Sequence, residues 1–443
     1  MLLRGAAGPF PGCGAGARRL ARPVAGRELE CNTSVFYIRV TFLTSDSGAV
    51  QGDPIKSDHR TRRTGVRPTP ETPAELAELR ETVLRTCRDF GHEYYVRSSD
   101  AGDNARDLWR ALGGIGALGA GISAEHGGAG AGVEALSVVA EAIAEAGLPL
   151  MLVALSPAVC ATMLDGFGTP AQKAEWLPGL ADGSRVLGFA ITEPDAGSNT
   201  HNLRMRARRD GDEWVLSGQK YYVSHVDNAD ALLTVARAGD ELRVFIVPTD
   251  APGLTTSPIE VEILSPERQY SVFYDEVRVP GSAMVGADAG MAVLYAGLNP
   301  ERIVSAALLN GIAGYAIDIA VKYARERTVW SVPIGAHQAV SHPLARAETA
   351  LTASRLLTSS AARAFDRGET GGVEAAMAKL TASEAASAAL DAAMQTLGGN
   401  GMSREYGLAT LHGLVRLFRI APVSSEMLLN HVAHKRLSLP RSY

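Results

Sequence analysis

The stretch VLGFAITEPDAGSN, residues 186–199, marks the point at which the sequence changes from helical to strand-like periodicity. Upstream, apolar residues recur at helical spacing from a predicted capping box, Thr72-Pro73-Ala74-Glu75, with Pro73 at the first helical position. Downstream, strand-like runs separated by turns continue to about residue 288; they include RMRARR (204–209), EWVLSG (213–218), KYYVSH (220–225) and ALLTVARA (231–238).

After Gly290 the helical period returns in long Ala-rich stretches. This order predicts an α+β multi-domain chain. We expect an N-terminal α-helical domain (71–184), a middle β-barrel or sandwich domain (185–288) and a C-terminal antiparallel four-helix bundle (289–443).

Residues 1–70 are rich in arginine, and Pro and Gly interrupt every apolar run. This composition predicts a disordered basic extension. A mitochondrial transit peptide is the alternative, which would place the protein in the matrix; otherwise we expect it in the cytoplasm.

The whole chain has 443 residues, 46% hydrophobic and 21% charged, with a formal net charge of −5. A large core is therefore expected, and binding to nucleic acid through bulk positive charge is excluded. Four scattered Cys predict neither a disulfide framework nor a metal site. The most apolar run, 148–164, is broken by Pro149 and Pro157, so we predict a buried helix or pocket wall and no membrane span.

Three motifs could carry chemistry. AITEPDAGSN (190–199) follows a strand and offers hydroxyls and backbone amides to a ligand, although an ordinary turn is the alternative. In QKYYVSH (219–225), Tyr221 and Tyr222 are expected on opposite sheet faces, with Tyr222 and Ser224 sharing one face toward a planar cofactor; a core tyrosine is the alternative. QTLGGNGM (395–402) is a glycine loop that permits close approach of a phosphate, and alone it is weak evidence.

The three motifs occur in this order across an α–β–α chain, and together they resemble the acyl-CoA dehydrogenase family. AITEPDAGSN resembles the family's first signature and QTLGGNGMSREYG the start of its second. The resemblance covers roughly residues 73–437, with further similar segments at GISAEHGGAG (121–130), FGTPAQKAEWLPGLADG (167–183) and FYDEVRVPGSAMVG (273–286).

The resemblance implies an FAD-dependent enzyme that converts an acyl thioester to the trans-2-enoyl thioester. A carboxylate takes the α proton, and the β hydrogen leaves as hydride to the flavin. It also implies a homotetramer or homodimer, and electron-transferring flavoprotein or a similar electron acceptor. Whether the acyl carrier is coenzyme A or an acyl carrier protein stays open.

The resemblance assigns roles to individual residues. Flavin contacts are implied for Ala190, Ile191, Thr192, Ser198, Tyr222 and Ser224. Contacts to the adenosine diphosphate half, some from a neighbouring subunit, are implied for Arg327, Gln338, Gln395, Gly398 and Gly399, and a further cofactor contact for Ser424. Substrate contacts are implied for Ser198, Asn299 and Arg302.

The catalytic base is the main departure from the family pattern. Many members place a glutamate where this sequence has Pro422, which also lacks the amide that helps to bind the thioester oxygen. The isovaleryl and long-chain subgroup places its glutamate on an earlier helix, at a position matching Glu301. We therefore predict Glu301 as the base, with Glu426 as a weaker rival. The alternative for Glu301 is a helix N-terminal acid after Asn299-Pro300.

Two other functions remain open. The loss of the amide at Pro422 is compatible with a non-catalytic subunit that pairs with an active homologue. The second open function is that of a flavin monooxygenase or oxidase with the same fold. Flavin content, bleaching by substrate and oxygen consumption distinguish these functions from a dehydrogenase.

Overall fold

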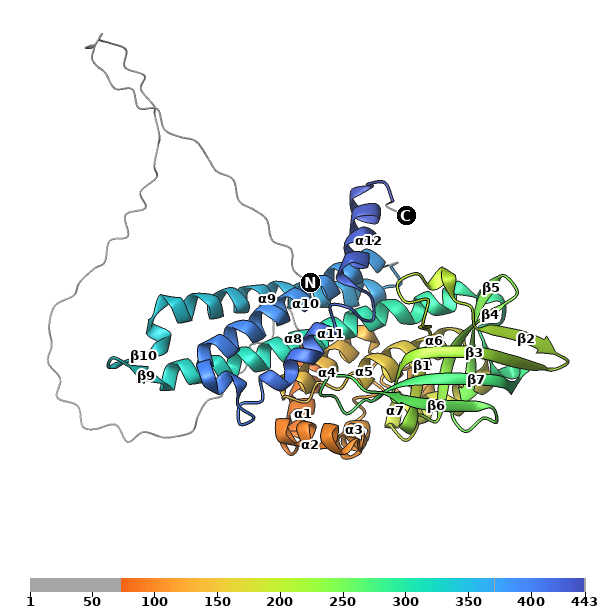
Figure 1. The fold of residues 1–443 in the computed structure, drawn as a ribbon, viewed down its shortest axis with the longest axis horizontal. Helices are drawn as coiled ribbons and strands as arrows, with labels where there is room; N and C mark the ends of the chain where they lie inside the picture. The colour runs from red at the N-terminus through yellow and green to blue at the C-terminus, as the bar shows by residue number, and fades with distance from the viewer. Residues whose placement is uncertain (1–72, 370, 442–443) are drawn as a thin grey trace, which may run out of the picture. The chain divides into compact units, whose positions relative to one another are not determined.

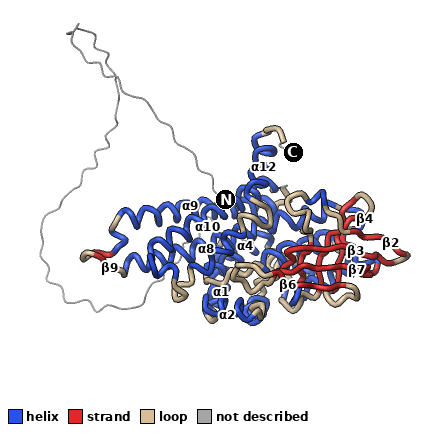
Figure 2. The backbone as a smooth tube through the Cα atoms, in the orientation of Figure 1, coloured by secondary structure: helices blue, strands red, loops and turns tan. Residues whose placement is uncertain are grey.

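The computed structural model describes residues 73–369 and 371–441 of the chain. The predicted extension 1–70 and Thr72 of the predicted capping box lie outside the described residues. Helices form the described chain as far as Asp182, strands dominate from Leu187 to Val285, and helices return at Met291. Strands and helices gather in separate regions, as the predicted α–β–α order requires (Figure 2).

The N-terminal helices are α1 (Ala74–Arg88), α2 (Gly91–Ala101), α3 (Arg106–Gly114), α4 (Gly132–Glu145), α5 (Leu152–Leu155), α6 (Thr162–Phe167) and α7 (Pro170–Asp182), with a π-helical turn at Ser156–Ala161 between α5 and α6. Pro73 occupies the cap position before α1, so the expectation that it is the first helical residue is wrong by one residue. A complete capping box instead opens α7, where the Thr169 side chain accepts from the Gln172 N–H at 3.2 Å.

The strands of the middle region form one mixed sheet in the order β6-β7-β3-β2-β4-β5-β8, with β1 pairing in parallel with β4 (Figure 1). Their bounds are β1 (Leu187–Ala190), β2 (Arg206–Asp210), β3 (Glu213–Ser224), β4 (Ala231–Ala238), β5 (Glu241–Pro248), β6 (Leu254–Ile259), β7 (Gln269–Pro280) and β8 (Met284–Val285). The runs EWVLSG and KYYVSH, predicted as separate strands, form the single long strand β3.

The C-terminal helices are α8 (Met291–Glu326), α9 (Gln338–Asp366), α10 (Gly372–Leu397), α11 (His412–Leu417) and α12 (Ser425–Leu437), with a small hairpin, β9 (Thr328–Val329) and β10 (Val332–Pro333), between α8 and α9. The three long helices pack on one another, and α4 packs on α8 and α9.

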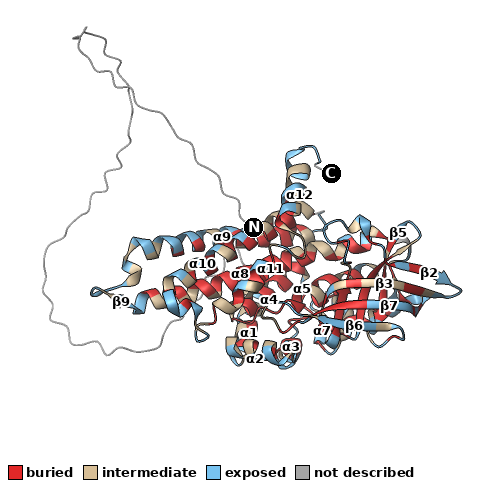
Figure 3. Ribbon diagram, in the orientation of Figure 1, coloured by how far each residue is buried: buried red, intermediate tan, exposed pale blue. Residues whose placement is uncertain are grey.

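Helix α8 runs through the core of the helical part. A Cβ on Gly311 would lie 2.3 Å from the Glu141 carbonyl oxygen, so only glycine allows α8 and α4 to approach this closely. Among the described residues α8 alone is long and apolar enough to cross a membrane, but 83% of its most apolar window is buried within the protein. Buried residues are concentrated along α8 and the helices beside it (Figure 3).

Candidate functional site

The loop after β1 carries the first predicted ligand motif. Ala190 is buried at the end of β1, Ile191 and Thr192 are half-buried, and Ser198 is exposed. The Tyr221 N–H donates to the Thr192 carbonyl at 2.8 Å, which joins the loop to β3. The structure therefore brings the first two predicted motifs together.

Tyr222 lies in a β-bulge of β3. Its φ of +54° is in the left-handed region, and the pairing with β7 shifts register between Lys220 and Val223. The ring centroids of Tyr221 and Tyr222 are 4.4 Å apart, so the expectation that they point to opposite faces is wrong. The bulge interrupts the two-residue alternation on which that expectation rested.

The bulge exposes the Tyr222 side chain, of which 53% is accessible. The alternative that Tyr222 is a core tyrosine is therefore wrong. Two residues on, Ser224 is half-buried at the end of β3, and its hydroxyl lies 2.9 Å from the Gln269 side-chain nitrogen.

Glu301 lies in the middle of α8, ten residues after the helix begins at Met291. The alternative that Glu301 is a helix N-terminal acid is therefore wrong, because α8 continues through Pro300. The residue is only 6% exposed. Burial raises the pKa of Glu301 to about 7, although the positive charges of Arg302 and Lys379 oppose the rise. A carboxyl group with this pKa is suited to general base catalysis near neutral pH.

Two elements besides α8 lie beside Glu301, the π-helical turn and α10. Cys160, in the buried π-helical turn, has a pKa raised well above its usual value by burial and by the charge of Glu301. Lys379 of α10 is fully buried and donates to the Val423 carbonyl at 2.7 Å. The run 148–164 is thus mostly buried and reaches the candidate base at Cys160, in agreement with its predicted burial.

The two predicted substrate contacts, Asn299 and Arg302, lie on α8 next to Glu301. The Arg302 Nη1 donates to the Asn299 Oδ1 at 2.9 Å. A Cβ on Gly372, at the start of α10, would lie 3.5 Å from the His431 Nε2 and 3.8 Å from the Asn299 side-chain nitrogen. The start of α10 and helix α12 therefore meet α8 at Asn299.

Helix α12 carries the rival base and another predicted cofactor contact. Glu426 is exposed in its first turn, and hydrogen bonds from its own N–H and from Ser424 hold its pKa below the usual value. The Ser424 hydroxyl accepts from the Met427 N–H at 3.3 Å as the helix cap. An exposed carboxylate with a lowered pKa is a weaker base than Glu301.

The residues expected to bind the adenosine end lie at the helix ends. Arg327 follows α8, Gln338 begins α9, and the glycine loop follows α10. All are exposed, and Gly398 has a φ of +58°, as a left-handed loop position favours. Since Arg327 lies 26 residues beyond Glu301, about 39 Å separates them along the helix axis. The end of α8 and the β9–β10 hairpin lie at the opposite end of the described chain from β3, the strand that carries Tyr222 (Figure 1).

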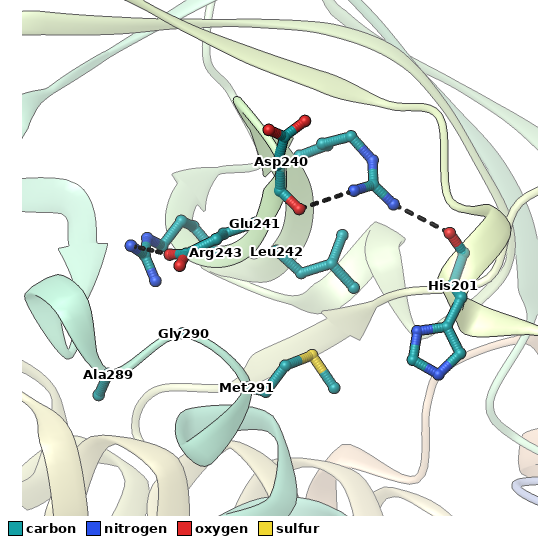
Figure 4. Close-up of a pocket in the computed structure, with 9 residues that line it drawn as sticks. His201, Asp240, Glu241, Leu242, Arg243, Ala289, Gly290 and Met291 are labelled. Atoms are coloured by element: carbon teal, nitrogen blue, oxygen red, sulfur yellow. Dashed lines mark hydrogen bonds and ion pairs between the residues drawn. The ribbon is translucent and has the colours of Figure 1, made fainter.

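A cavity of about 310 Å³ lies between the β4–β5 turn and the start of α8 (Figure 4). Arg237 donates to the carbonyls of His201 at 2.9 Å and Asp240 at 3.0 Å on its rim, and Leu242 and Met291 contribute apolar lining. The sequence does not predict this cavity, because residues from three separate segments form it and none has a distinctive local pattern.

A buried ion pair beneath the flavin motif was also missed. The Lys220 Nζ lies 2.9 Å from the Glu193 Oε1, and both side chains are buried. An acid inside the motif and a lysine on the adjacent strand were visible in the sequence, but their pairing depends on the loop geometry.

These residues fit a flavin. The exposed ring of Tyr222 offers an aromatic face for stacking beside the loop backbone at Ile191 and Thr192, and Ser224 offers a hydroxyl nearby. FAD is therefore compatible with the chemistry of this loop, and the glycine loop at Gly398 suits a phosphate-bearing group.

Comparison with known proteins identifies the family of the chain. The chain matches family models for the N-terminal domain (residues 73–184), the middle domain (188–267) and the C-terminal domain (288–437) of acyl-CoA dehydrogenases. It is 49% identical to acyl-CoA dehydrogenase FadE12 of Mycobacterium tuberculosis, over 83% of this chain and 97% of that protein. It is 33% identical to glutaryl-CoA dehydrogenase of Desulfococcus multivorans, over 78% of this chain and 92% of that one.

Solved structures give the same result. The fold matches glutaryl-CoA dehydrogenase from Mycobacterium smegmatis with a TM-score of 0.79 at 27% identity, covering 84% of this chain and 97% of that one. A structure of a glutaryl-CoA dehydrogenase from that organism with FADH2 matches with the same TM-score at 25% identity, covering the same shares of the two chains. The chain therefore belongs to the acyl-CoA dehydrogenase family, as an oxidoreductase whose cofactor is FAD.

Proposed function

We propose that the protein catalyses α,β-dehydrogenation of an acyl-CoA thioester to the trans-2-enoyl thioester, with Glu301 as the general base. The observation that carries the proposal is the burial of Glu301 in the middle of α8, where its pKa rises to about 7. Glu301 is oriented by the rigid helix rather than by a loop, which suits a base that must be held close to the substrate.

The residues of the site have distinct parts in the proposed reaction. The Glu301 carboxylate accepts the α proton, and Asn299 and Arg302 bind the substrate beside it. Bound FAD supplies the acceptor for the β hydride. Tyr222 and the loop at residues 190–198 hold the flavin ring, and the buried wall of residues 148–164 excludes water from the acyl group.

The thioester oxygen needs a hydrogen-bond donor other than the residue 422 amide, because proline has no N–H. FAD held by the loop at residues 190–198 would supply a hydroxyl donor of its ribityl chain for this oxygen.

The cavity at the start of α8 supports coenzyme A as the acyl carrier. Met291 lies ten residues, about 15 Å, before Glu301 along the helix, a distance that a pantetheine arm can span. We propose that the arm runs along the exposed side of α8 from this cavity to Asn299.

The separation of the two predicted halves of the FAD site supports an oligomer. About 39 Å of helix lies between Glu301 and Arg327, more than an extended FAD can bridge. We propose that Arg327, Gln338 and the glycine loop bind the adenosine end of the FAD held by a second subunit, in a homodimer or homotetramer. Electron-transferring flavoprotein or a similar protein is the proposed electron acceptor.

Pro422 favours one competing function, that of a non-catalytic subunit. Anaerobic titration of the purified FAD-loaded protein with a panel of acyl-CoA thioesters distinguishes the two, with the same acyl groups on acyl carrier protein as a second arm. Bleaching of the flavin absorbance by at least one acyl-CoA supports dehydrogenation. Stoichiometric FAD that no acyl thioester bleaches would instead support the non-catalytic function, and rapid oxygen consumption by the reduced protein would indicate an oxidase or monooxygenase.

A further inference from the structure

Glu193 lies at the base of the loop that carries the proposed flavin contacts. Its carboxylate accepts from the N–H of Arg204 at 2.6 Å and from the N–H of Met205 at 3.0 Å. The Glu193 N–H and carbonyl also form a backbone bridge with Ala196. One carboxylate thus ties the start of the loop after β1 to the residues just before β2, eleven positions later.

Lys220 completes this arrangement from the adjacent strand. Its side chain is fully buried, and its Nζ donates to the Glu193 Oε1 at 2.9 Å and to the Ile191 carbonyl at 2.8 Å. The next residue, Tyr221, donates its N–H to the Thr192 carbonyl. Three consecutive loop residues, 191–193, are therefore fixed to β3 immediately before the bulge that presents Tyr222.

Both groups carry their charges at neutral pH. Burial raises the pKa of Glu193, but the hydrogen bonds from the Arg204 N–H and Lys220 outweigh that effect and hold it below its usual value. Burial lowers the pKa of Lys220 to about 8, against the attraction of Glu193. The hydrogen bonds of the pair are therefore charge-assisted, and these are the stronger kind.

We propose that Glu193 and Lys220 are positioning residues for the flavin: the buried pair holds the backbone at Ile191 and Thr192, and the Tyr222 bulge, in the geometry that binds the flavin ring. The pair itself does not touch the ring. This role rests on the proposed flavin site. It explains why a buried charge pair is placed at the base of an otherwise exposed loop.

The test measures FAD affinity and amide hydrogen exchange of the full-length protein, after removal of the flavin and titration with FAD. In Lys220→Met and Glu193→Gln, we expect the Kd for FAD to rise by about 10- to 100-fold, the worth of one or two charge-assisted hydrogen bonds. We also expect faster exchange of the Arg204 and Met205 amides. The double variant, Glu193→Gln with Lys220→Met, leaves no lone buried charge and tests the role if either single variant fails to fold.

Arg80→Met is the matched control, because it breaks a largely buried ion pair between Arg80 and Glu145 in the helical part of the chain. We expect it to lower thermal stability without changing the Kd for FAD. Wild-type affinity in both single variants and the double variant would overturn the proposed role, as would an equal loss of affinity in Arg80→Met.

The same measurement separates this role from the flavin site on which it rests. In the wild-type protein, FAD should slow amide exchange across residues 190–205. If FAD binds without changing exchange there, the flavin site is elsewhere and both proposals fail. If FAD protects the loop but the variants bind it normally, only the positioning role fails.

Discussion

Glu301 is buried, yet it must carry a negative charge to act as a base, and burial disfavours that charge. Burial raises its pKa to about 7, which means that the folded protein favours the protonated form more than the unfolded chain does. Between the usual glutamate pKa of about 4.5 and a pKa of about 7, the folded state binds the extra proton, so stability falls as the pH rises through this window. Ionisation of the proposed base therefore comes at some cost in stability.

The pH dependence of flavin reduction should follow the ionisation of Glu301. Only the carboxylate accepts the α proton, so the rate of flavin reduction by an acyl-CoA substrate should fall about tenfold for each pH unit below about 7 and level off above it. Stopped-flow absorbance under anaerobic conditions measures this rate. A rate that does not change between pH 5 and 8 would contradict a base with this pKa.

The charge of Lys379 should influence the pH at which the rate of flavin reduction begins to fall. Lys379 is fully buried beside Glu301, and its charge lowers the pKa of that carboxyl group. Lys379→Met should therefore move the acid limb of the profile to higher pH, whereas Lys435→Met, which removes an exposed charge on α12, should leave it in place. The pH profiles of the two variants provide the check, and an unchanged limb in Lys379→Met would exclude the electrostatic role.

At the scale of elements, β3 shows what could be predicted from the sequence. The short apolar runs in EWVLSG and KYYVSH predict strand correctly, and the two segments join through Gln219 as one continuous strand. The bulge at Tyr222 could not be predicted, because it depends on the pairing with β7 and on the contact between Tyr221 and the Thr192 carbonyl. Strand β6, with its exposed polar residues, carries no alternation that would reveal it.

The start of helix α8 was predicted at the wrong position. Asn299-Pro300-Glu301 is typical of a helix start, yet the helix begins nine residues before Pro300. A proline inside a helix costs about 3 kcal/mol, and tertiary packing must offset that cost. At Gly297 a Cβ would lie 2.9 Å from the Val159 carbonyl oxygen, so this part of α8 packs tightly against the π-helical turn. The candidate base was predictable from the resemblance, but its burial was not.

The Tyr222 side chain should be required for flavin binding rather than for folding. Because its ring is 53% exposed, Tyr222→Ala should leave the thermal stability of the flavin-free protein nearly unchanged and should weaken FAD binding by roughly tenfold, from lost stacking. Tyr222→Phe keeps the ring and is the control. Fluorescence titration with FAD measures both, and wild-type affinity in Tyr222→Ala would remove this residue from the site.

At the scale of the whole molecule, the proposed shared site needs two chains for one cofactor, with Tyr222 supplied by one chain and Arg327 by the other. Arg327→Ala chains keep the ring side of the site, and Tyr222→Ala chains keep the adenosine side. Either variant alone should bind FAD weakly. Subunits of the two variants, mixed and allowed to exchange, should recover tight binding at a fraction of the sites. FAD content after gel filtration measures this recovery, and no recovery in confirmed mixed oligomers would contradict a shared site.

Flavin reduction in Glu301→Gln tests the central claim most directly. Glutamine matches the size of glutamate and carries no charge, so the variant should fold, retain FAD and still bind acyl-CoA. Flavin reduction measured by anaerobic stopped-flow should slow by about 10²–10⁴-fold, whereas Glu426→Gln should reduce its flavin within a few-fold of the wild-type rate. A Glu301→Gln protein that reduces its flavin at the wild-type rate would show that another group removes the α proton.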